Sequence, residues 1–121
     1  MIEKERCPEM HELIGFFESN PSIESAGEMN WPYQCVTFLY SAGVEELNCT
    51  IWPIECFFSI VWRQGGKERL SARFHMIRRI QVENRWVGEL LTVQFDPESH
   101  VDHLILRLKP HIQGMILTKE Y

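Results

Sequence analysis

The side chains best able to do chemistry gather between residues 96 and 111. They are three carboxylates and three histidines: Asp96, Glu98, His100, Asp102, His103 and His111. Together they could hold a zinc or iron ion, or supply a general base beside an orienting acid. Their spacing fits no established metal site, because the histidines lead into a strand-like run where neighbouring side chains point to opposite faces. We expect a polar loop between strands, with a small metal-dependent or acid/base enzyme built on the Asp96–His103 loop as the alternative.

A second group combines arginines with aromatic side chains. Its members are Arg69, Arg73, Arg78, Arg79 and Arg85, interleaved with Phe74, His75 and Trp86. On one sheet face such residues could follow a phosphate backbone and stack on bases. The whole chain has a net charge of -5 and a pI of about 5.5, whereas nucleic-acid-binding domains are usually basic. A nucleic-acid partner is therefore not expected. RNA or single-strand binding through this sheet face is kept as a further alternative.

Acidic side chains are concentrated in the first half of the chain. Residues 1–60 contain ten glutamates and two basic residues, whereas residues 61–121 contain ten basic and seven acidic residues. Few of the early glutamates have basic neighbours in sequence, so we expect part of their charge to stay uncompensated on the surface. Such a surface accelerates encounter with a basic partner. The same charge could instead serve solubility, or pair with arginines of the second half after folding.

Two aromatic residues flank Pro32, where a polar segment meets a strand-like run. Trp and Tyr dominate binding hot spots, although they also fill small cores. Because loops often carry binding residues, we predict that Trp31 and Tyr33 contact a partner. The predicted partner-binding set consists of Glu9, Glu12, Glu45, Glu46, Trp31 and Tyr33.

An N-terminal helix is predicted over residues 8–19. Pro8 suits a first helical position, and Met10, Leu13 and Phe17 recur at helical spacing on one face. The following segment, residues 20–32, is polar and contains three prolines and glycines at positions 21, 27 and 32, which favours a loop.

From residue 33 to about 118 the hydrophobic period changes to two, which indicates strands. A hairpin is predicted across residues 41–43 and another across residues 64–67, where adjacent glycines permit positive φ. Residues 56–63 are apolar on both parities, as in a central strand covered on both faces. The strand after Gly66 is expected to run on through Ile80 and Val82. The sequence predicts one α+β domain, residues 1–121, in which the helix packs on a mainly antiparallel sheet of six or seven strands.

The composition indicates an ordinary globular protein, 45% hydrophobic and 24% charged, with no secretory signal pattern. We expect a cytoplasmic protein with no membrane partner, and free thiols at Cys7, Cys35, Cys49 and Cys56. Motifs of nucleotide-binding loops, serine hydrolases and zinc proteases are absent from the sequence.

These features favour a non-enzymatic binding protein without a cofactor or metal. The hypothesis is a bacterial immunity or antitoxin protein that inhibits a basic toxin, such as a nuclease, by direct binding. A nuclease must be basic to hold phosphates, and its inhibitor needs complementary charge and aromatic anchors but no catalytic residues. A homodimer is compatible with the same sequence.

Overall fold

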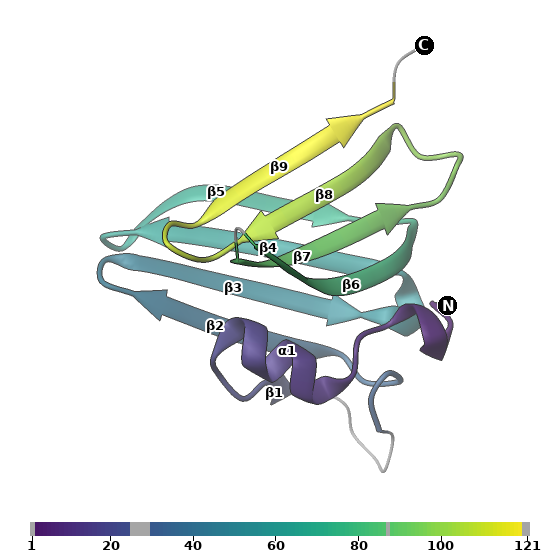
Figure 1. The fold of residues 1–121 in the computed structure, drawn as a ribbon, viewed down its shortest axis with the longest axis horizontal. Coiled ribbons are helices and arrows are strands. Elements are labelled where there is room, and N and C mark those ends of the chain that lie inside the picture. Colours follow the sequence, from purple (N-terminus) through teal and green to yellow (C-terminus); the bar gives the residue numbers. More distant parts are fainter. Residues whose placement is uncertain (1, 25–29, 87, 120–121) are drawn as a thin grey trace.

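The computed structural model describes residues 2–24, 30–86 and 88–119, which form two antiparallel sheets and a helix. The first sheet follows chain order: β1 Ser22–Ile23, β2 Val36–Ala42, β3 Glu45–Trp52, β4 Phe57–Gln64 and β5 Lys67–Phe74. The second does the same: β6 Ile77–Arg85, β7 Gly88–Phe95, β8 Val101–Arg107 and β9 Gln113–Thr118. The helical segments are η1 Lys4–Arg6, α1 Met10–Phe17 and η2 Pro53–Glu55. Figure 1 shows the two sheets as separate layers.

The hairpins arise where the sequence allows positive φ. Gly43 joins β2 to β3, and Gly65 and Gly66 join β4 to β5, with φ values of 61°, 58° and 81°. Glycine reaches these angles without a steric penalty from a Cβ atom. The predicted hairpins therefore form with register pairs such as Ala42↔Glu45 and Gln64↔Lys67.

α1 is shorter than the predicted helix at both ends, since it begins at Met10 and ends at Phe17. Glu9 is the N-cap, and its carboxylate accepts the backbone N–H of Glu12 while the Glu12 side chain accepts the N–H of Glu9 at 3.0 Å. This reciprocal capping box satisfies two N–H groups that have no partner within the helix. At the other end, Glu18 adopts a left-handed conformation with φ 55° and terminates the helix.

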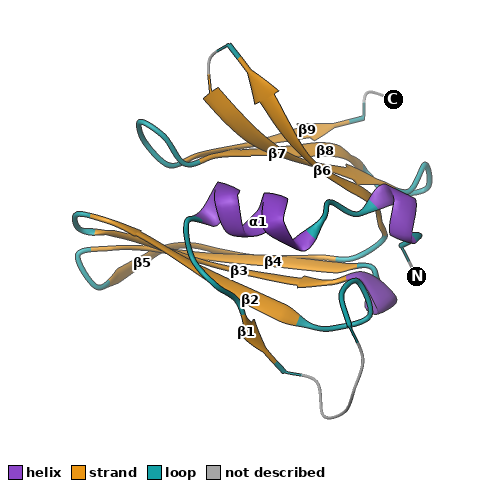
Figure 2. Cartoon of the chain, turned by 60° about the horizontal axis from the view of Figure 1, so that its bottom comes forward, coloured by secondary structure: helices purple, strands orange, loops and turns teal. Residues whose placement is uncertain are grey.

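The core fills the space between the sheets, and α1 closes one open side of it. Leu13, Phe16 and Phe17 are buried, and the ring of Phe17 stacks on Phe38 of β2 with centroids 4.7 Å apart. Figure 2 shows α1 lying between the two sheets, and α1 contacts β2, β6 and β7. Burial of these apolar side chains is the main stabilising contribution, at roughly 25 cal/mol per Å².

The α+β class matches the prediction, but the single sheet of six or seven strands was wrong. The chain leaves the first sheet after β5 and begins the second at Ile77. Between them Met76 has φ 64°, a left-handed conformation that interrupts the extended backbone. The sequence has no Gly or Pro at this break, so the strand after Gly66 was expected to continue through Ile80.

The interpretation of residues 56–63 as a strand covered on both faces was also wrong. β4 buries Phe58 and Ile60 against the core, while Phe57, Ser59 and Val61 alternate on the outer face and are partly exposed. No described element packs over that face. Among the described residues, no helix has the length and hydropathy that a membrane crossing requires.

Candidate partner-binding surface

Glu45 and Glu46 begin β3, and the strand directs their side chains to opposite faces. Glu45 is half-buried, and its carboxylate accepts hydrogen bonds from the indole N–H of Trp62 and, at 2.7 Å, from the Gln64 amide. Gln64 in turn accepts a hydrogen bond from Arg69 at 3.1 Å. Glu45 therefore stabilises the end of the sheet, whereas Glu46 is exposed and available to a partner.

Glu9 and Glu12 lie at the start of α1, near the opposite end of the first sheet. Both carboxylates are used in the capping box, and Glu9 remains exposed while Glu12 is half-buried. Their negative charge also interacts favourably with the positive end of the helix dipole. These two residues therefore combine a role in the helix with a charge that an approaching protein would encounter.

Trp31 and Tyr33 lie beside the beginning of α1. The Trp31 indole donates a hydrogen bond to the backbone oxygen of Pro8 at 2.8 Å, and the ring packs partly against the core. Tyr33 is 41% exposed. Trp31 thus fixes the segment before β2 against the N-terminal segment, and Tyr33 is the more accessible of the two aromatic side chains.

The structure separates the six predicted residues into two places. Register pairs Val36 with Ile51 at one end of the β2–β3 hairpin and Ala42 with Glu45 at the other. Along a strand of this length the two ends lie roughly 20 Å apart, at about 3.3 Å per residue. We call Glu9, Glu12, Trp31 and Tyr33 the helix-entry surface. Glu46 lies at the far end, so a partner touching all of these residues would have to span the first sheet.

Arginines of the second half neutralise few of the early glutamates. Among the described residues, one ion pair joins a first-half glutamate to a second-half base, between Glu18 and Lys109. Glu3 contacts Arg6 at 3.6 Å within the N-terminal segment. Arg79 lines a shallow depression with Glu5 and Glu12 without an ion pair to either. Much of the acidic charge therefore stays on the surface.

Within the Asp96–His103 segment, residues 96–100 form a compact turn after β7, and residues 101–103 begin β8. The Asp96 carboxylate accepts the N–H of Glu98 at 3.0 Å, and its carbonyl accepts the N–H of Ser99 at 2.9 Å. His103 contacts Asp102 through Nδ1.

His100 and His111 are exposed on the loops that flank β8. In the part of the chain that is described, no three His, Cys, Asp or Glu side chains converge as metal ligands.

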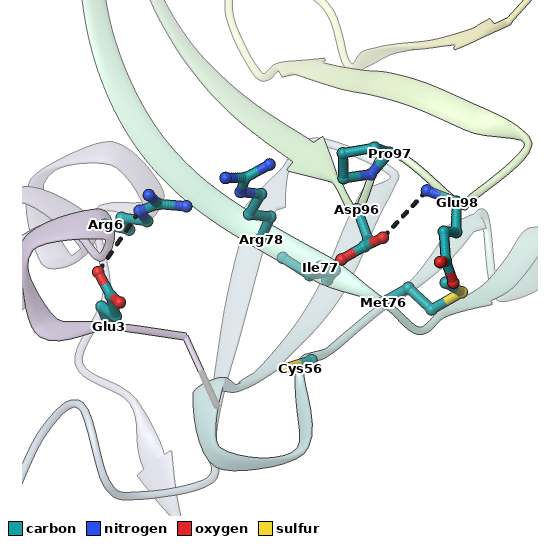
Figure 3. Close-up of a pocket in the computed structure, with 9 residues that line it drawn as sticks. All are labelled: Glu3, Arg6, Cys56, Met76, Ile77, Arg78, Asp96, Pro97 and Glu98. Atoms are coloured by element: carbon teal, nitrogen blue, oxygen red, sulfur yellow. Dashed lines mark hydrogen bonds and ion pairs between the residues drawn. The ribbon is translucent and has the colours of Figure 1, made fainter.

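An open depression of about 630 Å³ lies beside this turn (Figure 3). Asp96 and Glu98 line one side, Arg6 and Arg78 the other, and Cys56, Met76 and Ile77 also contribute to its lining. Opposite charges of this kind produce a mixed polar surface. An adjoining depression holds Arg6, Arg78 and Arg79 with the Asp102–His103 pair.

The predicted arginine face is divided between the two sheets. Arg69 and Arg73 lie on β5 in the first sheet, whereas Arg78, Arg79 and Arg85 lie on β6 in the second. Arg85 also pairs with Glu83 at 2.9 Å. A single sheet face lined by these arginines, as the nucleic-acid alternative assumed, is therefore not formed.

The sequence analysis placed Trp86 only in the nucleic-acid alternative, as a base-stacking side chain, and did not include it among the candidate protein contacts. Trp86 lies in the turn between β6 and β7 and is 98% exposed. A fully exposed Trp is rare, and Trp is enriched in binding hot spots. The polar residues Asn84 and Arg85 immediately before it, which are typical of a turn, were the available signal.

The thiols lie mainly inside the protein and are all free, as expected. Burial raises the pKa of Cys49 well above its ordinary value and raises the pKa of Cys7 to about 11, with a smaller contribution from nearby Cys56. Burial also raises the pKa of Cys35, assisted by the charge of Glu24. These groups remain neutral near pH 7.

The fold resembles that of one chain in a solved structure. A chain in the "Contact-dependent growth inhibition toxin - immunity protein complex from Klebsiella pneumoniae 342" superposes with a TM-score of 0.79 and 15% sequence identity. The match covers 94% of this chain and 96% of that chain. No protein-family model and no curated protein sequence matches. At this identity the similarity shows a shared fold.

Proposed function

We propose that this protein is an immunity protein that inhibits a toxin by binding it directly. The observation that carries the proposal is the fold shared with a chain of the growth-inhibition toxin–immunity complex over nearly the whole of both chains. The surface charge supports the same role, because many of the early glutamates have no basic partner among the described residues. We further propose that the toxin is basic, as a nuclease would be, and that the protein acts in the cytoplasm without catalysis.

The proposed acidic contacts are Glu46 and the two glutamates of the helix-entry surface, Glu9 and Glu12. Exposed carboxylates guide a basic protein toward the complex and raise its association rate, and salt screens this effect. Tyr33 and Trp86 are the most accessible aromatic side chains near acidic groups, since Glu83 and Glu89 lie beside Trp86 in the β6–β7 hairpin. The active site of a toxin held by these residues would be blocked by the bulk and the negative charge of the bound protein.

The decisive experiment is a growth-protection assay with a candidate toxin, sought first among the proteins encoded by the neighbouring genes. Expression of the toxin domain should arrest growth, and co-expression of this protein should restore it. Expression of this protein alone should leave growth unchanged, since a toxin rather than an inhibitor would arrest it. Absence of protection, together with no complex between the purified proteins, would reject the proposal.

Binding kinetics test the charge component separately. Glu46→Lys reverses a charge that makes no described hydrogen bond, so association should slow several-fold at low salt. Because Arg63 lies opposite residue 46 on β4, the melting temperature should fall slightly, and kinetics are compared at a temperature where both proteins are fully folded. Glu98→Lys is the matched control, because it makes the same substitution at an exposed glutamate in the turn between β7 and β8, which is not among the proposed contacts. Equal association rates for Glu46→Lys and the unaltered protein would remove Glu46 from the interface.

A further inference from the structure

β9 is the outer strand of the second sheet, and its free edge lacks the features that keep sheet edges from pairing. All six of its residues are exposed, and none is charged. The backbone N–H and C=O groups along such an edge can bond to any strand that lies beside it. Natural proteins block this with charged residues, proline, very short strands or a covering segment.

The other outer strands of the described sheets carry such protection. β1 has two residues, and α1 contacts β2 behind it. β5 carries four charged residues among eight, and β6 carries four among nine and contacts η1 and α1. β9 is therefore the exception, and in Figure 1 it forms the outer margin of its sheet.

The side chains of β9 are apolar as well as uncharged. Met115, Ile116 and Leu117 are 56%, 46% and 42% exposed. Register places Ile116 opposite Leu104, which faces the core, and Met115 opposite Ile105 on the outer face. Both faces of this edge thus expose apolar surface that a further strand would cover.

An apolar groove of about 80 Å³ adjoins the inner face of β9. It opens between the sheets on the side away from α1, and Trp62 and Leu70 line it opposite Ile116. The core is consequently closed by α1 along one side and left accessible along the other. Covering β9 would bury apolar area on the accessible side.

We propose that β9 pairs with β9 of a second copy of this chain, antiparallel about a twofold axis. In antiparallel pairing about a twofold axis, the residue on the axis opposes itself and the residues beside it oppose each other across the axis, so a charged residue near the axis would lie close to the same charge on the other copy. Gln113–Thr118 contains no charge, which removes this penalty, and with the axis at Ile116 the Met115 side chain of each copy would pack against Leu117 of the other. A basic toxin would instead be attracted to the acidic residues of the first half. The dimer is therefore independent of the proposed toxin contacts.

Sedimentation and light scattering of the full chain over a range of concentrations test this proposal. The unaltered protein should be a dimer that high salt does not weaken, since the interface contains no ion pair. The Met115→Lys/Leu117→Lys double variant introduces opposed charges, and its dimer dissociation constant should rise roughly tenfold or more. Leu39→Lys is the control, because Leu39 is 49% exposed on β2 of the other sheet. This control should remain dimeric.

Hydrogen exchange of the unaltered protein provides a second test that does not depend on a variant folding correctly. The β9 amides should exchange more slowly at high than at low protein concentration, because strand pairing protects them. A monomer at every concentration, a dimer unaffected by the double variant, or concentration-dependent protection confined to another strand would each overturn self-pairing. If the unaltered protein were a monomer and the double variant failed to bind the toxin, the β9 edge would be a contact for the toxin and not for a second copy.

Discussion

Glu45 and Glu46 are adjacent in sequence but perform different tasks. Glu45→Ala leaves the indole N–H of Trp62 and the Gln64 amide without their acceptor. Loss of a partly buried acceptor costs about 1–3 kcal/mol, whereas Glu46→Ala should stay within about 0.5 kcal/mol of the unaltered protein. Urea denaturation of both variants measures the difference. Equal stabilities would mean that the Glu45 hydrogen bonds contribute nothing.

Cys49 makes stability depend on alkaline pH. Burial holds its pKa above the ordinary value of 9.0, so the native thiol stays neutral while the unfolded thiol ionises. Above pH 9 the unfolded state therefore binds fewer protons than the native state, and the free energy of unfolding falls by up to about 1.4 kcal/mol per pH unit for this group. Below pH 9 the contribution is constant.

Denaturation measured at several pH values between 8 and 10.5, in the presence of a reductant, would reveal this dependence. Cys49→Ala should lower stability at pH 8 but show a shallower decline above pH 9. An identical slope for the variant and the unaltered protein would assign the decline to other groups.

At the scale of the element, α1 depends on its capping box, in which Glu12 also carries a candidate contact charge. Glu12→Ala should lower stability by about 1 kcal/mol through loss of the cap, whereas Glu12→Gln retains a side-chain acceptor. Glu12→Gln nevertheless removes the negative charge. If Glu12 guides a basic toxin, this variant should keep its melting temperature and associate more slowly at low salt. Slower association of the Ala variant alone would identify a structural effect.

The two sheets also illustrate how elements are joined. Local hairpin signals, such as Gly65-Gly66, act within a few residues and were readable from sequence. The transition from β5 to β6 depends on Met76 in a left-handed conformation, with Ile77 and Phe74 packing into the core on either side. Tertiary packing imposes this conformation on a residue whose own preference opposes it.

At the scale of the whole molecule, the uneven charge should make toxin binding sensitive to salt. Between low and high ionic strength the association rate constant should fall by about tenfold or more, while the dissociation rate constant changes less. Stopped-flow mixing with the purified toxin would measure both constants. An association rate that is independent of salt would show that the acidic residues do not guide the encounter.

Sequence alone determined the hairpins, the amphipathic helix, the α+β class and the surplus of acidic residues, because each depends on local spacing or on composition. Tertiary structure decided the rest. It divided the strands into two sheets at Met76, moved the arginines apart, and turned Glu45 toward Trp62 and Gln64 while leaving Glu46 free. It also left β9 as an uncharged outer strand. These features depend on contacts between residues distant in sequence, and no local pattern encodes which strand will be outermost or which carboxylate will find a donor.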